Sequence, residues 1–194
     1  MTAVEKTPRS ENPAGTVRAL LFVSLLGALL WLAAIFLAPG LESRGSSRSA
    51  GFLYALFSPT CHQMPERCFS FRGYPLAVCG RCLGVYAGFL AGLVAYPFVR
   101  GISKLELPRA RTFLWFSVPI GVDGLAGILG IWTSPIGVRF ATGVLWGTIL
   151  PFYFITGVAE LIVSRKARAR ARLSPGAHQA VKTAVEKPSA KSVE

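Results

Sequence analysis

The four cysteines of this chain lie close together in the sequence. They are Cys61, Cys68, Cys79 and Cys82. Cysteines that serve only as small buried hydrophobic residues would be spread over the apolar segments of the chain. Thiols grouped in this way are instead typical of metal sites, of thiol–disulfide exchange, or of structural disulfides in an outer loop.

The C-x2-C pair formed by Cys79 and Cys82 predicts a metal site. This spacing lets both sulfurs reach one tetrahedral ion. We expect Cys61, together with either Cys68 or His62, to complete the ligand set. A zinc-like ion is the cofactor that such ligands favour.

Thiol–disulfide exchange is the main alternative. If a helix begins near Leu83, the C-x2-C pair lies at its N-terminus, where the helix dipole and Arg81 would stabilise a thiolate. A redox partner would then be required. In a third hypothesis the cysteines form structural disulfides, and the protein is a small transporter or lipid-handling protein.

Four long runs with few or no charges predict the elements that carry these residues. They predict an all-α, multi-pass transmembrane bundle of four helices. The helices are expected near residues 19–38, 82–99, 112–132 and 140–163, with a cysteine-rich loop over 40–81. Residues 1–17 and 165–194 are polar and are expected to be disordered tails of a single membrane domain over 18–164.

The first two segments need separate comment. The first apolar run is too long for the apolar region of a signal peptide, so we interpret it as a retained helix that ends at Pro39-Gly40. Segment 51–57 is apolar but too short to cross a bilayer, and we expect it to be interfacial or re-entrant.

Basic residues predict the orientation of the bundle in the cell membrane. With a cytoplasmic N-terminus, the inner segments hold 15 lysines and arginines and the outer segments hold six. This asymmetry places both termini in the cytoplasm and the cysteine-rich loop outside. The net charge of +12 does not indicate a nucleic-acid partner, because the basic residues flank apolar stretches that favour the lipid bilayer.

Every lysine falls on the inner side, and the outer segments use arginine only. The outer arginines are Arg44, Arg48, Arg67, Arg72, Arg81 and Arg139. A planar guanidinium holds carboxylates or phosphates in fixed geometry. We therefore expect these arginines to be pairing groups more than solubilising charges.

Asp123 lies within the third predicted helix. A carboxylate at the bilayer centre costs about 2.5–3.5 kcal/mol even on insertion scales, so Asp123 should face the interior and have a partner. Arg72, Arg81 and Arg139 are the candidate partners. The pair would be either an interhelical salt bridge or a proton or cation site beside the thiols.

Glycines recur along the three later helices at spacings of three or four. The sets are Gly80, Gly84, Gly88 and Gly92; Gly121, Gly124, Gly127 and Gly130; and Gly143 and Gly147. Such stripes predict close helix packing, either within the chain or between copies in a homo-oligomer.

The motif Cys61-His62-Gln63-x-Pro65-x-Arg67, followed by Cys79-x-Arg81-Cys82-x-Gly84-x-Tyr86-x-Gly88, resembles the signature of a prokaryotic family of small predicted membrane proteins, domain-of-unknown-function family 2085. Asp123-Gly124 and Arg139 are similar to its second half, so the resemblance covers about residues 50–155. It implies membership and no reaction. It favours Cys61, His62, Cys79 and Cys82 as metal ligands, with further candidate site residues Gln63, Arg67, Cys68, Arg81, Asp123 and Arg139.

Overall fold

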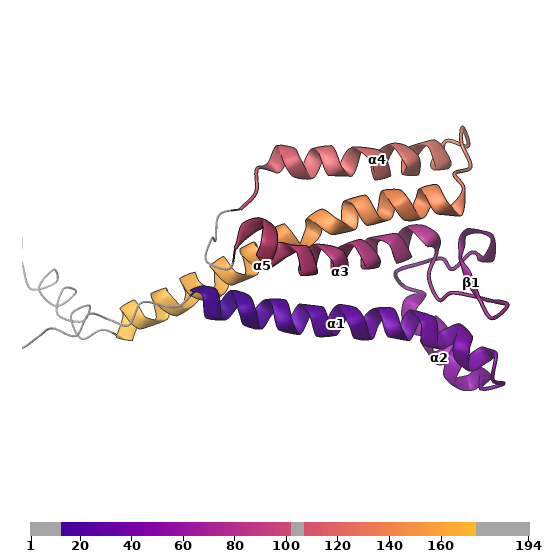
Figure 1. Ribbon diagram of the computed structural model, residues 1–194, viewed down its shortest axis with the longest axis horizontal. Coiled ribbons are helices and arrows are strands. Elements are labelled where there is room, and N and C mark those ends of the chain that lie inside the picture. The colour runs from indigo at the N-terminus through magenta and orange to yellow at the C-terminus, as the bar shows by residue number, and fades with distance from the viewer. Residues whose placement is uncertain (1–12, 102–106, 174–194) are drawn as a thin grey trace, which may run out of the picture.

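The structure is a computed structural model that describes residues 13–101 and 107–173, most of them helical. Four long helices run along a common axis (Figure 1). They are α1 (Pro13–Glu42), α3 (Gly80–Arg100), α4 (Ala110–Ile128) and α5 (Ile136–Leu173). Between α1 and α3 lie α2 (Ser47–Phe57), the 3-10 turn η1 (Pro65–Arg67), and a hairpin of β1 (Ser70–Phe71) and β2 (Tyr74–Pro75). The parts of the predicted tails at 1–12 and 174–194 lie outside the described residues.

Three of these helices are long and apolar enough to cross a membrane. The candidate spans are Ala14–Glu42, Gly80–Arg100 and Ile136–Ala169. Among the described helices α4 is not one of the three; it carries Arg111 and Asp123, which lower its mean hydropathy. The predicted all-α class is therefore confirmed, with three candidate membrane crossings in the described residues.

The ends of two helices differ from the prediction. Instead of ending before Pro39, α1 continues to Glu42. A proline removes one helical N–H bond, but the Pro39 carbonyl still accepts the Ser43 N–H at 3.0 Å, and Pro39 is fully buried. At the other end of the chain α5 continues through Arg165 to Leu173, because this stretch consists mainly of the strong helix formers alanine, arginine and lysine.

The turn after α4 is also shifted. The helix ends at Ile128 and not near residue 132. Gly130 explains this, because it adopts a left-handed conformation with φ of 70°, which is typical of the residue just beyond a helix C-terminus.

The segment expected to be a loop over 40–81 is largely structured. Residues 51–57 form the second half of α2, and Phe57 packs with Ile35 and Ala38 of α1. The hairpin turn places Arg72 and Gly73 at φ values of 53° and 85°, the left-handed pair that a two-residue turn requires. The cysteines therefore lie on a packed cap at one end of the bundle, together with the α4–α5 turn (Figure 1).

The closest helix pair is α3 against α5, and glycines make it possible. A Cβ added at Gly84 or Gly88 of α3 would overlap the carbonyl oxygens of Phe140 or Val144 of α5. Reciprocally, a Cβ at Gly143 of α5 would overlap the Arg81 carbonyl. Close packing is thus confirmed for these stripes, which are used within the chain.

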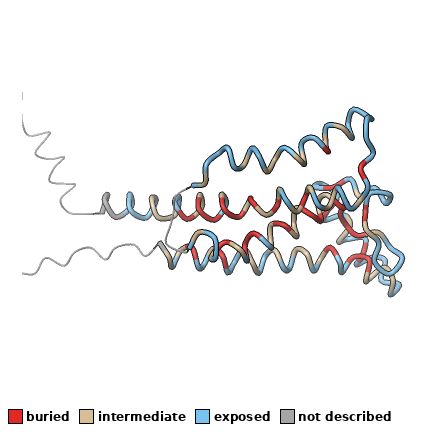
Figure 2. The backbone as a smooth tube through the Cα atoms, turned by 45° about the horizontal axis from the view of Figure 1, so that its top comes forward, coloured by how far each residue is buried: buried red, intermediate tan, exposed pale blue. Residues whose placement is uncertain are grey.

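The glycines of α4 behave differently. A Cβ added at Gly121 or Gly130 would meet nothing within 4 Å, and one at Gly124 or Gly127 would make only ordinary contacts, so no other helix backbone packs closely on this stripe. Figure 2 shows that most of α4 is exposed, whereas buried residues concentrate where α3 meets α5. Homo-oligomer formation through α4 remains a prediction.

Polar side chains fasten α4 to the rest of the molecule. Trp146 Nε1 donates to Ser117 Oγ at 3.0 Å, and the Tyr153 hydroxyl donates to the Arg109 carbonyl at 2.8 Å. A third tether is the ion pair between Asp123 and Arg81 of α3. α4 is thus held at three levels along its length.

Candidate metal centre

Three of the four thiols converge on one point. The sulfurs of Cys61, Cys79 and Cys82 all lie within 4.8 Å of one another. Cys61 follows α2, Cys79 is the residue immediately before α3, and Cys82 lies in the first turn of α3. A tetrahedral zinc ion with sulfurs at about 2.3 Å sets them about 3.8 Å apart, so the observed grouping is close to that of a metal site.

Backbone hydrogen bonds fix the relative position of the thiols. The Cys79 N–H donates to Cys61 Sγ at 3.1 Å, and the Cys61 N–H donates to the Phe57 carbonyl at 3.1 Å. The first bond joins the two halves of the site directly. Cys61 is therefore placed by the end of α2, while Cys79 and Cys82 are placed by the start of α3.

Gln63 braces the segment that carries Cys61. Its Nε2 donates to the Tyr54 carbonyl at 2.7 Å and to the Ala77 carbonyl at 2.8 Å. Tyr54 adds a second link, because its hydroxyl donates to the Pro75 carbonyl at 2.6 Å. These bonds tie α2 to the strand that leads into Cys79.

Apolar packing surrounds the thiols on the inner side. Leu76, Ala77 and Val78 are buried and pack with Phe57 and Leu83 in one hydrophobic cluster that includes Cys61. On the other side the three thiols border a cavity of about 340 Å³. The site is thus rigid and apolar behind the sulfurs and accessible in front of them.

The thiols differ in their protonation. The pKa of Cys79 is lowered, first by hydrogen bonds with the side chains of Cys61 and Cys82 and further by the backbone amides of Cys82 and Arg81. The contribution of these backbone amides is expected at a helix N-terminus, but the neighbouring thiols have the larger effect. Burial raises the pKa of Cys68 to about 12, and Cys68 is not a member of the three-thiol group.

The remaining predicted ligand stands apart from the sulfurs. His62 is exposed and borders the same cavity, but it is not part of the three-thiol group. Arg67 and Arg139 also border this cavity, as do Gln63 and Arg81. The structure therefore brings most of the predicted site residues around one cavity, with Cys68 and Asp123 outside its lining.

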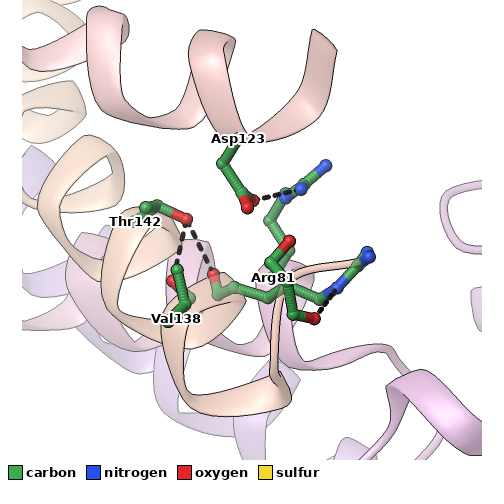
Figure 3. A network of polar contacts seen from close by, with 6 residues as sticks. Arg81, Asp123, Val138 and Thr142 are labelled. Atoms are coloured by element: carbon green, nitrogen blue, oxygen red, sulfur yellow. Dashed lines mark hydrogen bonds and ion pairs between the residues drawn. The ribbon is translucent and has the colours of Figure 1, made fainter. Parts of the chain in front are cut away.

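Asp123 has Arg81 as its partner. Figure 3 shows Asp123 pointing from α4 toward Arg81, with which it forms an ion pair. Asp123 is only 7% exposed. Of the other candidate partners, Arg139 donates through Nε to the Ser134 carbonyl at 2.9 Å, and Arg72 lies 5.5 Å from the Phe71 ring. The interhelical salt bridge is thus the observed state of Asp123.

Two structural residues of the site carried little signal in the sequence. Tyr54 lay in a segment interpreted only as apolar, although a tyrosine in a short amphipathic helix often needs a hydrogen-bond partner. Ala77 contributes only its carbonyl, which no side-chain pattern reveals. Both belong to the frame that holds Cys61 beside Cys79.

The comparisons with known proteins agree with this picture of a membrane protein. The profile of a family described as "Predicted membrane protein (DUF2085)" matches residues 61–154. An uncharacterized protein of Methanocaldococcus jannaschii is 33% identical over 148 residues, which cover 74% of this chain and 95% of that protein. An uncharacterized protein of Methanothermobacter thermautotrophicus is 36% identical over 87 residues, covering 45% of this chain and 77% of that protein. No solved structure matches.

Proposed function

The chain belongs to the DUF2085 family of predicted membrane proteins, and we propose that its function centres on a metal ion bound by Cys61, Cys79 and Cys82 at the membrane surface. The observation that carries the proposal is the convergence of these three sulfurs within 4.8 Å. Structural disulfides explain this grouping less well, because two disulfides would need the fourth cysteine, Cys68, in the same cluster.

Zinc is the ion that best suits this donor set. Thiolates are soft ligands that favour zinc over magnesium or calcium, and zinc accepts tetrahedral coordination without a redox requirement. Three protein ligands leave one position on the cavity side. Zinc in such an open site polarises a bound oxygen or lowers the pKa of bound water.

The four-ligand set that includes His62 is the alternative arrangement. His62 borders the same cavity, so a change of its side-chain direction would be required to close the site. Substitution separates the two arrangements. With three thiolate ligands, His62→Ala keeps the metal, whereas in a closed site it loses the metal as a cysteine substitution does.

The proposal is tested by metal analysis of cysteine variants. The full chain, purified in detergent, should carry about one zinc-like ion, and Cys61→Ser, Cys79→Ser and Cys82→Ser should each lose it. Cys68→Ser is the matched control, because this thiol is buried, as that of Cys61 is, but lies outside the three-thiol group. Loss of metal in Cys68→Ser to the same extent would contradict the three-ligand site.

Thiol–disulfide exchange is the second candidate, and the lowered pKa of Cys79 favours it. In this reaction Cys79 attacks a partner disulfide, one partner sulfur leaves as a thiolate, and Cys82 then displaces the partner to close a Cys79–Cys82 disulfide. Cys82→Ser should trap the mixed disulfide with a partner. A metal-free preparation in which this pair cycles between dithiol and disulfide would support this candidate over the metal site.

We further propose that α4 is a fourth crossing and that the cysteine cap faces the outside. Supporting this, the three polar tethers hold α4 alongside α3 and α5, and α4 exposes large apolar residues such as Trp115 and Ile128. A membrane-impermeant thiol reagent on intact cells should label Ser46→Cys above the background of the native cysteines, and should not label Lys166→Cys. The reverse labelling would place the thiols in the cytoplasm.

A further inference from the structure

The cavity in front of the thiols is lined by positive side chains. Three arginines, Arg67, Arg81 and Arg139, are among the residues that line it. These three arginines come from separate elements: Arg67 from η1, Arg81 from the start of α3, and Arg139 from the first turns of α5. Folding thus brings three arginines from distant parts of the sequence to one volume of about 340 Å³.

The acidic side chains of the protein do not neutralise all three arginines. Within residues 13–101 and 107–173, Arg81 pairs with Asp123, which does not border the cavity. Arg67 has only its exposed neighbour Glu66, at 4.0 Å, and such exposed pairs contribute little. Arg139 donates through Nε to a neutral carbonyl, that of Ser134.

The proposed metal ion does not remove this excess. Three thiolates and one divalent ion together carry one negative charge. Asp123 offsets the charge of Arg81. Because Arg67 and Arg139 carry two positive charges, the net charge around the cavity remains +1. An anion that enters the cavity would meet this charge and the open position of the metal.

The geometry of guanidinium groups selects among anions. A guanidinium presents its N–H donors as a planar fork that matches phosphate and carboxylate oxygens. A carboxylate has two oxygens, whereas a terminal phosphoryl group has three, so only the phosphoryl group offers a separate oxygen to each of three arginines. The exclusive use of arginine in the outer segments fits the same chemistry.

We propose that this cavity binds a phosphoryl group, either of free phosphate or of a lipid headgroup, through Arg67, Arg81 and Arg139. The inference deepens the proposed metal site and rests on it for the ion beside the phosphoryl group. It assigns that site a phosphate-bearing ligand.

The test measures phosphate binding to the full chain purified in detergent. Isothermal titration calorimetry measures the affinity for inorganic phosphate and for short-chain phosphatidic acid. Acetate, a planar carboxylate, is the comparison anion. Binding of inorganic phosphate identifies a free-phosphate site, and binding of phosphatidic acid alone identifies a headgroup site. Either result supports the inference, whereas stronger binding of acetate than of both phosphates overturns it.

Substitutions locate the binding. Arg67→Gln removes a cavity arginine whose side chain is 48% exposed and keeps a polar side chain of similar length, so the variant should fold. We expect its affinity for phosphate to fall about tenfold or more. Arg139→Gln should act in the same direction. Arg44→Gln is the matched control, because Arg44 is an exposed arginine outside the cavity lining, and its affinity should equal that of the wild type.

Zinc content measured on the same samples separates the two proposals. Zinc-bearing protein that binds neither phosphate probe, or that binds equally after Arg67→Gln, overturns the phosphoryl site and leaves the metal site standing. Zinc-free protein overturns the metal site. In that case phosphate binding that is lost in Arg67→Gln and kept in Arg44→Gln still supports the phosphoryl site.

Discussion

Arg81 stands between the two cysteines of the C-x2-C pair and forms an ion pair with Asp123 on α4. One residue therefore belongs both to the thiol site and to the only charged link between α3 and α4 in the described part of the chain. A displacement of α4 would act on the residue that separates Cys79 from Cys82. The position of α4 is thus coupled directly to the geometry of the site.

Removing one partner of this pair should destabilise the protein strongly. Asp123→Ala leaves Arg81 without its counter-ion in a partly buried position, which we expect to lower the free energy of unfolding by about 3–5 kcal/mol. Asp123→Asn should have a smaller effect, because the amide still accepts a hydrogen bond. The measurement is denaturant unfolding in detergent for Asp123→Ala, Arg81→Met and the double variant. Purely additive effects would show that the two residues are not coupled.

The glycine contacts between α3 and α5 predict a sharp difference between two alanine substitutions. Gly88→Ala forces a Cβ into the Val144 carbonyl and should destabilise the protein by about 1–3 kcal/mol. Gly121→Ala on α4 is the control, since its Cβ would enter open space and alanine favours the helix. Thermal unfolding of both variants in the same detergent tests this. Equal stability of the two would mean that α3 and α5 are farther apart than described.

The amide of Gln63 should matter for metal affinity without being a ligand. Gln63→Glu keeps the size of the side chain but replaces the donor that binds the Tyr54 and Ala77 carbonyls. Loss of such a supporting contact should weaken metal binding about 10- to 100-fold. Competition with a chromogenic chelator measures this affinity. Glu66→Gln, an exposed neighbour, should bind as the wild type does; a similar loss in both variants would show that the loss does not depend on the hydrogen bonds of Gln63.

Cys68 should differ from Cys79 in reactivity. Only the thiolate is a nucleophile, and burial raises the pKa of Cys68 to about 12, so at pH 8 this thiol stays protonated. After chelation, iodoacetamide at pH 8 should modify Cys79 and spare Cys68 until the pH approaches 12 or the protein unfolds. Peptide mass spectrometry identifies the modified residues. Rapid modification of Cys68 at pH 8 in the folded protein would show that this thiol is accessible and not buried.

The sequence predicted the elements that depend on local pattern. The apolar runs correspond to α1, α3 and α5, and the C-x2-C spacing identified Cys79 and Cys82 as a pair. The clustering of the thiols also predicted Cys61 as a further ligand, because thiols are rarely clustered without a shared role. Asp123 was expected to be paired, since an isolated buried carboxylate is too costly.

Features that depend on tertiary contacts could not be predicted in the same way. The continuation of α1 through Pro39 depends on the burial of that residue against the cap, which no local propensity reports. The glycines of α4 recur as regularly as those of α3, yet only the α3 set lies against the backbone of another helix. Likewise, adjacency in sequence suggested His62 as a ligand, but in the structure its side chain lies outside the three-thiol group.

X-ray absorption at the zinc edge of the detergent-purified full chain tests the three-thiol metal centre most directly. This measurement counts the sulfur atoms around the bound ion and gives their distances. The account predicts about one zinc per chain, three sulfurs at about 2.3 Å and one lighter atom from the cavity side. A zinc ion with four sulfurs, or a protein that holds no metal and titrates as a Cys79–Cys82 dithiol, would contradict it.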